Sequence, residues 1–195
     1  TSSHEMLNQL QSNIVWGLRG NFLDIPTDCP QRDERLGWTG DAQVFTPAAI
    51  FISDVHSFLA SWLESMRLDQ QPDGAIPSII PDIKNLLGNR CGGPGWSDAA
   101  TVMPWEIYIR TGDISVLREN FDMMNRWAGW YESKANNRII DVDAWGDWLQ
   151  PHPASGNPQG DTPRDLLVTA YFARSADPPA QAARRPGKTA DAERL

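Results

Sequence analysis

The chain has 195 residues, of which 41% are hydrophobic and 22% charged, a composition typical of one folded globular domain. Its 17 basic and 25 acidic residues give a net charge of −8, which argues against nucleic-acid binding, because phosphate recognition needs clustered Lys and Arg. No apolar run approaches the roughly 20 residues that span a bilayer, and the polar N-terminus has no signal-peptide core. The sequence therefore predicts no membrane partner and assigns no localisation.

Two further features concern the chain as a whole. The cysteines, Cys29 and Cys91, both fall in predicted loops, and we expect free thiols because a domain of this size does not need a disulfide. The first residue is not methionine and the chain opens partway into a helical pattern. We therefore expect an excised piece of a longer protein.

The first half of the chain predicts three helices. Apolar residues recur at helical spacing from Met6 to Leu18, which indicates an amphipathic helix ending near Gly20. After a charged loop, Asp41 is a plausible N-cap for a helix over residues 41–51. Ser53 or Asp54 then caps a longer helix, and residues 70–95 form a turn-rich connection that is too long to be a mere link.

The second half predicts three more helices and an interrupted tail. A helix runs from residue 97 or 98 to 111, and Gly112 with Asp113 ends it and starts the next, which runs to about residue 135. A second long loop covers residues 136–163, and a helix follows it. In residues 173–195 we expect a broken or frayed helix, because Pro178, Pro179 and Pro186 lie where a helix interior excludes proline.

This order of elements indicates an all-α fold. Antiparallel helix pairs whose connections are alternately short and long favour a helical toroid with functional loops on one rim. We find no internal repeat of fixed period, which disfavours a simple solenoid.

Residues 24–41 are the richest chemical feature, with five acidic side chains, two arginines and one tryptophan in a loop that contains proline and glycine. A sugar-cleaving pocket uses this mixture. Carboxyl groups transfer protons, an aromatic face covers the apolar side of a sugar ring, and arginine binds hydroxyls. The alternative is a surface loop tied by ion pairs.

The string DIPTDCPQRDERLGWTGDAQVF resembles the acid-bearing segment of the α-L-rhamnosidases of glycoside hydrolase family 78. Four later stretches match the family in order: DGAIPSIIP, GPGWSDAATVMPWEIYIRTGD, the helix around MMNRWAGWY, and WGDWL. The resemblance implies a partial (α/α)6 barrel, the six-hairpin glycosidase toroid, with about half of its helices present. It assigns residues 1–175 to the N-terminal part of that catalytic domain and leaves 176–195 as a degenerate or frayed helical tail.

The resemblance also implies an inverting hydrolysis of terminal α-L-rhamnose and names the residues of the site. Glu34 is the implied general acid. The implied substrate-binding residues are Asp28, Arg32, Trp38, Asp41, Trp96, Asp98, Trp145 and Trp148. Two of these roles have a structural alternative: Glu34 can be the ion-pair partner of Arg32 or Arg35, and Asp41 can be a helix N-cap.

The remaining candidates are interpreted from spacing. We interpret the tryptophans at helical spacing as core residues: Trp16, Trp62, Trp105, Trp127 and Trp130. His56 is interpreted as structural, and His152 as a residue within reach of the pocket. No ligand spacing for a metal and no cofactor motif is found, so neither is predicted. The general base of the family lies beyond the matched residues, so we expect it to be absent from this chain.

Three functions remain open from the sequence. The favoured one is an α-L-rhamnosidase-like hydrolase acting on a rhamnose-containing carbohydrate, with the rest of its catalytic domain missing. The second is a truncated, inactive sugar-binding or structural remnant. The third is another hydrolase on the same toroid, such as a glucoamylase-like enzyme, which shares the fold but not the DERLGWTGD string.

Overall fold

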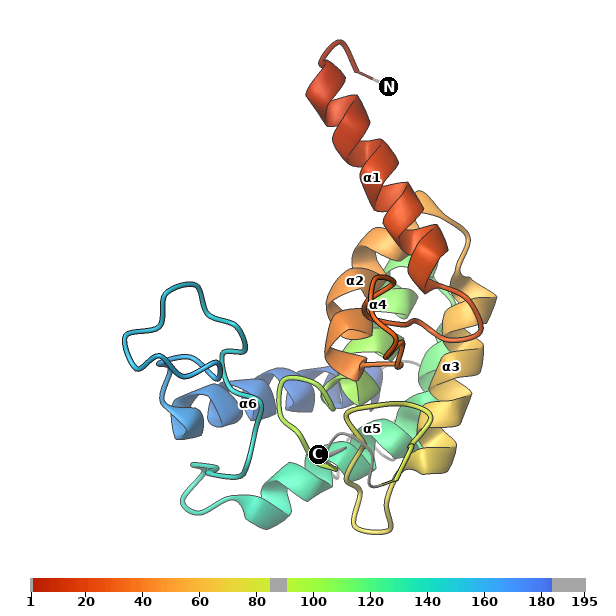
Figure 1. Cartoon of the computed structure of the whole chain (residues 1–195). Coiled ribbons are helices and arrows are strands. Elements are labelled where there is room, and N and C mark those ends of the chain that lie inside the picture. Colours follow the sequence, from red (N-terminus) through yellow and green to blue (C-terminus); the bar gives the residue numbers. More distant parts are fainter. Residues whose placement is uncertain (1, 85–90, 184–195) are drawn as a thin grey trace.

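The computed structural model describes residues 2–84 and 91–183, and they form six helices (Figure 1). The helices are α1 (Glu5–Asn21), α2 (Thr39–Ile52), α3 (His56–Asp69), α4 (Ala99–Thr111), α5 (Ile114–Lys134) and α6 (Arg164–Ala183). The described residues contain no β-strand, and their β-type pairing is limited to isolated β-bridges. The all-α prediction is therefore confirmed, and so are the two long loops, which precede α4 and α6.

Helix α4 lies at the centre and packs against α2, α3, α5 and α6. Its residues 99–104 are all buried, so this helix has no solvent face in its first turns. Several of these residues are small, which lets neighbouring helices approach closely. The core around it is aromatic, with Trp127 stacked on Trp130 at a centroid distance of 4.9 Å and Tyr131 edge-on to Trp127 at 4.7 Å.

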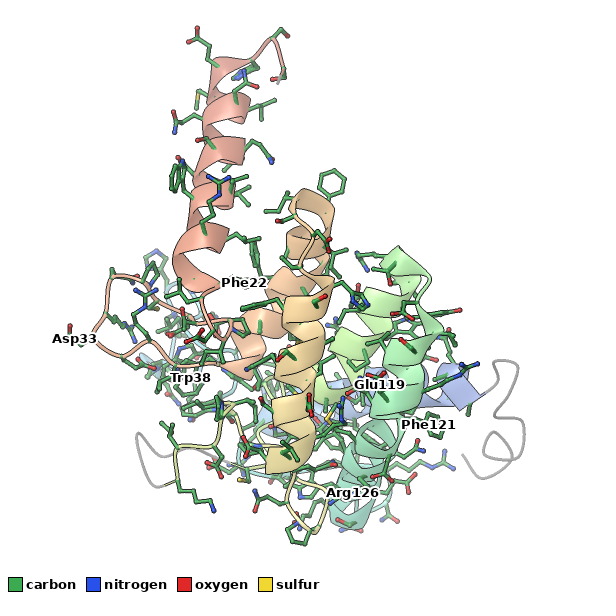
Figure 2. The ribbon with its side chains drawn as sticks, turned by 90° about the vertical axis from the view of Figure 1, so that its right-hand side faces the viewer. Phe22, Asp33, Trp38, Glu119, Phe121 and Arg126 are labelled. Atoms are coloured by element: carbon green, nitrogen blue, oxygen red, sulfur yellow. The ribbon has the colours of Figure 1, made fainter. Side chains whose placement is uncertain are left out.

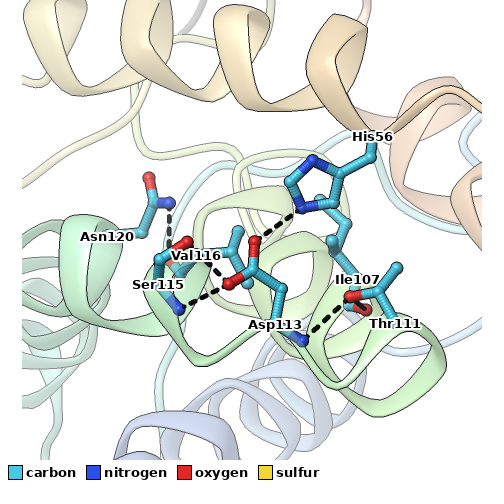
Figure 3. Close-up of polar contacts among 7 residues, drawn as sticks. All are labelled: His56, Ile107, Thr111, Asp113, Ser115, Val116 and Asn120. Carbon is cyan, nitrogen blue, oxygen red and sulfur yellow. Dashed lines mark hydrogen bonds and ion pairs between the residues drawn. The ribbon is translucent and has the colours of Figure 1, made fainter.

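The turn between α4 and α5 was correctly predicted from two residues. Gly112 has φ 75°, a left-handed conformation that favours glycine, and ends α4. The Asp113 carboxylate then caps α5 by accepting hydrogen bonds from the Ser115 backbone N–H and hydroxyl (Figure 3). His56 Nε2 of α3 lies 3.0 Å from the other Asp113 oxygen, an ion-pair contact when the imidazole is protonated.

This cap predicts a small acid-dependent term in stability. The Ser115 hydrogen bonds, and the His56 charge after them, lower the pKa of Asp113. The stabilisation is thus present above the unfolded-state pKa of about 4 and is lost as the pH falls through the lower folded-state pKa. We expect Asp113→Asn to destabilise the chain by about 1 kcal/mol or less at pH 7, since solvent screens this half-exposed group.

Urea unfolding between pH 2.5 and 7 measures the effect. The variant and the wild type should converge as the pH is lowered. A difference that stays constant over this range would exclude the ionised cap as its source.

Helix α1 corrects one prediction. It projects away from the other five helices in both views (Figure 1 and Figure 2), and its apolar residues Met6, Leu7 and Leu10 are exposed. Trp16, which we had interpreted as a core residue, is 66% exposed and stacks against the guanidinium of Arg19 instead. Helical periodicity identifies an apolar face, but burial also needs a partner along that face, and among the described residues none covers it.

Helix α6 corrects a second prediction, the broken or frayed helix expected in the tail. It continues through Pro178 and Pro179 to Ala183, so the break that we expected in residues 173–183 is absent and a boundary at residue 176 would fall inside a helix. Both prolines are buried, and α6 packs against α4 and α5. This packing offsets the two backbone hydrogen bonds that proline cannot donate. Residues 184–195 of the expected tail, including Pro186, lie outside the described residues.

Candidate functional site

The loops at one end of the helices enclose a cavity of about 900 Å³. Its walls come from residues 14–45, from the turn before α4, from residues 145–149 and from one face of α6. Eight of the nine predicted site residues line it: Asp28, Arg32, Glu34, Trp38, Asp41, Trp96, Trp145 and Trp148.

Backbone contacts hold the acid-bearing loop against the connection between α3 and α4. The Ile80 N–H donates to the Gly37 carbonyl at 2.9 Å, and the Thr39 N–H donates to the Ser78 carbonyl at 2.9 Å. A Cβ at Gly37 would lie 2.1 Å from the Ile80 carbonyl oxygen, so only glycine permits this approach. Arg35 donates to the Gly20 carbonyl and fixes the loop to the end of α1.

The Glu34 carboxyl group faces the cavity between two donors. Its Oε1 accepts a hydrogen bond from Trp38 Nε1 at 2.5 Å, and its Oε2 lies 3.3 Å from Arg32 Nη1. The side chain is 20% exposed, so the carboxyl group is accessible from the cavity. The ion pair with Arg32 exists, but the Arg32 side chain is 59% exposed, and an exposed pair of this kind contributes little to stability.

Two further carboxyl groups lie beside Glu34. Burial raises the pKa of Asp41, and the negative charges of Asp28 and Glu34 raise it further. Asp28 Oδ1 is buried, and no hydrogen-bond donor among the described residues reaches it. Asp28 also lines the cavity. Asp41 is not the N-cap that we considered, because α2 begins at Thr39 and Asp41 lies in its first turn.

Four tryptophans form a continuous aromatic wall. Trp145 contacts Trp38 at 5.4 Å, Trp96 at 5.8 Å and Trp148 at 5.7 Å between ring centroids. Trp145 Nε1 also donates to the Ser78 hydroxyl at 3.1 Å, which orients its ring. Aromatic faces beside carboxyl groups and an arginine can bind the apolar side of a sugar while the polar groups bind its hydroxyls.

Asp98 is the predicted site residue that the structure does not bring into the cavity. Its side chain is fully buried, and both carboxylate oxygens accept hydrogen bonds from protein groups. Asp98 therefore does not line the cavity, and its predicted direct contact with a ligand is not carried into the proposal below. The motif placed this carboxylate near the pocket, but the direction of its side chain depends on donors from α5 and α6.

The whole chain, residues 1–195, matches the model of the bacterial alpha-L-rhamnosidase six-hairpin glycosidase domain. The chain belongs to this family. An alpha-L-rhamnosidase of Formosa agariphila is 54% identical over 188 residues, which are 96% of this chain and 20% of that protein. An alpha-L-rhamnosidase of Alteromonas sp. strain LOR is 44% identical over 196 residues, 99% of this chain and 21% of that protein.

Solved structures of alpha-L-rhamnosidases share the fold. The Streptomyces avermitilis enzyme, solved in complex with L-rhamnose, superposes with a TM-score of 0.89 at 41% identity, covering 100% of this chain and 18% of that one. The Aspergillus terreus enzyme gives 0.87 at 35% identity and covers 100% of this chain and 23% of that one. The chain therefore spans about a fifth of the length of these rhamnosidase relatives.

The match to the six-hairpin glycosidase domain also confirms the predicted fold. The six described helices correspond to half of the twelve that six hairpins contain, as the partial (α/α)6 barrel implied. Membership of this family decides against the glucoamylase-like alternative.

In residues 2–84 and 91–183 no group of three or more His, Cys, Asp or Glu side chains is arranged to hold a metal ion. No helix in the same ranges is long and apolar enough to cross a membrane.

Some cavity residues were missed or misplaced by sequence reasoning. Tyr171 of α6 lines the cavity, but no pattern in the sequence indicates which side of α6 faces the loops. Asp147 also lines it and accepts a hydrogen bond from the Thr162 hydroxyl at 3.0 Å; its place inside WGDWL was the available signal. His152 does not line the cavity, so the expectation that it reaches the pocket is wrong. Cys29 and Cys91 are free thiols, as expected.

Proposed function

We propose that this chain forms the acid-bearing part of an α-L-rhamnosidase site that hydrolyses terminal α-L-rhamnose from glycosides or polysaccharides with inversion. The observation that carries the proposal is the convergence of Glu34, three further carboxyl groups and four tryptophans on one cavity, in a chain of the rhamnosidase family. The Streptomyces avermitilis relative was solved with L-rhamnose, which supports the choice of sugar.

In this proposal Glu34 is the general acid. It donates a proton to the glycosidic oxygen while the bond from the sugar to that oxygen breaks, and it is left as a carboxylate. Trp38 Nε1 and Arg32 then stabilise that carboxylate, because both are donors already directed at its oxygens. Asp28, Arg32 and Asp41 bind sugar hydroxyls, and Trp38, Trp96, Trp145 and Trp148 enclose the ring.

An inverting reaction also needs a carboxylate about 6.5–9.5 Å from the acid to activate water. We propose that this base is not among residues 1–195. Asp147 is the carboxylate in the cavity that could replace it. The alternative function, a sugar-binding or structural remnant, predicts binding without any turnover in a longer polypeptide as well.

The 195-residue chain should therefore show no measurable hydrolysis of 4-nitrophenyl α-L-rhamnoside, since general-base assistance is worth about 10²–10⁴-fold. The same chain should bind L-rhamnose weakly, and D-glucose less well, as detected by shifts of tryptophan side-chain NMR signals. Glu34→Gln supplies the blank for the assay. Turnover clearly above that blank would assign the base to this chain, with Asp147 as the first candidate, and no response to L-rhamnose would contradict the proposed site.

A further inference from the structure

The buried carboxylate of Asp98 accepts hydrogen bonds from three parts of the fold. Its Oδ2 accepts from the Gly95 backbone N–H at 2.6 Å. Its Oδ1 accepts from Trp127 Nε1 at 3.2 Å and from the Tyr131 hydroxyl at 3.0 Å, both on α5. The Ser175 hydroxyl of α6 also donates to Oδ1. All four donors are neutral, and burial raises the pKa of Asp98 while the hydrogen bonds oppose that rise. The buried carboxyl group is thus held by hydrogen bonds alone, and the loss of any donor leaves it less well compensated for its burial.

The Gly95 bond places Trp96 in the cavity. Trp96 directly follows Gly95, whose carbonyl accepts a further hydrogen bond from the Gln43 side chain of α2 at 3.2 Å. On the other side, Gly40 of α2 lies directly against the Trp96 ring, where a Cβ would be only 2.8 Å away. The ring is thus held between α2 and the turn that Asp98 fixes.

The Ser175 bond acts on the opposite wall. Ser175 lies one helical turn beyond Tyr171, so the two side chains share a face of α6. Tyr171 lines the cavity, and its ring lies 3.5 Å from where a Cβ of Gly95 would be. One carboxylate therefore joins the two elements that bring Trp96 and Tyr171 to the cavity.

We infer that Asp98 is a positioning residue of the proposed rhamnose site, acting through Trp96 and Tyr171 without touching the sugar. The inference rests on the proposed function for the identity of the ligand, but its geometric part stands on the contacts of Asp98. It replaces the direct sugar contact that the sequence had suggested.

The chemistry of the donors makes this role specific to a carboxylate. The Gly95 N–H and the Trp127 indole N–H can only donate, and each faces a different oxygen of Asp98. An asparagine must present its NH₂ group to one of these two N–H groups, whichever way its amide is turned. Asp98→Asn, nearly the same in size, is therefore expected to move either the Gly95 turn or Trp127.

The experiment uses the 195-residue chain labelled with 5-fluorotryptophan and observed by fluorine NMR. The Trp96 signal is assigned by its loss in Trp96→Phe. Asp98→Asn is compared with Asn120→Ala, a matched control in which another buried polar side chain is removed. Asn120 bonds to Arg67 and to the Val116 carbonyl, is 1% exposed and does not line the cavity. Both variants are measured where circular dichroism shows them folded.

The expected result is a shifted Trp96 signal and an affinity for L-rhamnose reduced about tenfold or more in Asp98→Asn, since small misplacements of a site are costly. Asn120→Ala should lower the urea midpoint but leave both readouts at wild-type values. An unmoved Trp96 signal in folded Asp98→Asn would overturn the inference, as would an equal shift in the control.

Two outcomes separate the inference from the proposed function. If the wild type does not respond to L-rhamnose but the Trp96 signal still moves in Asp98→Asn, the proposed function fails and the positioning role stands. If Asp98→Asn does not fold, Ser175→Ala, which removes a single donor, takes its place. In a sample labelled with 3-fluorotyrosine, where the Tyr171 signal is assigned by its loss in Tyr171→Phe, Ser175→Ala should shift that signal, and an unchanged Tyr171 signal would contradict the role.

Discussion

Replacing Glu34 by glutamine should abolish hydrolysis of an alkyl α-L-rhamnoside in a polypeptide of the relatives' length that carries these residues. The expected loss is about 10²–10⁴-fold, because the amide cannot transfer a proton to a leaving oxygen that needs one. A rhamnoside with an activated leaving group, such as 2,4-dinitrophenol, should lose much less, since that oxygen departs without protonation. The measurement is kcat/KM for both substrates.

The neighbouring carboxylate supplies a matched control for this prediction. Asp33 is exposed at the outer tip of the same loop, whereas Trp38, the partner of Glu34, lies at the base of the loop against the helices (Figure 2). Asp33→Asn changes the charge as Glu34→Gln does and should leave both substrates unaffected. Equal losses on the two substrates in Glu34→Gln would remove Glu34 from the role of acid.

Replacing Trp127 by alanine should destabilise the chain by about 3–5 kcal/mol, the usual cost of deleting a buried aromatic side chain. Trp127 is fully buried, stacks on Trp130 and donates a hydrogen bond to Asp98 Oδ1. The variant therefore loses packing and removes one hydrogen bond from a buried oxygen. Such a loss is a large part of the roughly 5–15 kcal/mol that stabilises a typical domain.

Trp16→Ala is the control for that prediction, because both tryptophans lie at helical spacing and only the structure distinguishes them. The 66% exposed Trp16 should change the free energy of unfolding by no more than about 0.5 kcal/mol. Urea unfolding followed by circular dichroism compares the two. Similar losses in both variants would show that α1 is covered by a partner in solution.

Local patterns in the sequence were sufficient for most of the elements and for the composition of the site. Capping signals at Gly112 and Asp113 act over neighbouring residues, so the turn between α4 and α5 could be predicted from them alone. The concentration of acids, arginines and Trp38 in one loop is likewise local, and the cavity does include that loop.

Tertiary structure decided whether each side chain has a partner, because that depends on residues far away in the chain. Trp16 is exposed since no described helix covers it, and Pro178 is tolerated inside a helix since it is buried in a helix that packs against α4 and α5. Asp98 turns into the core because three of its four donors come from residues 29 to 77 positions later, and no spacing near Asp98 reveals those three. Local patterns determined which chemical groups the chain carries, whereas packing over long sequence distances determined which of them face the cavity.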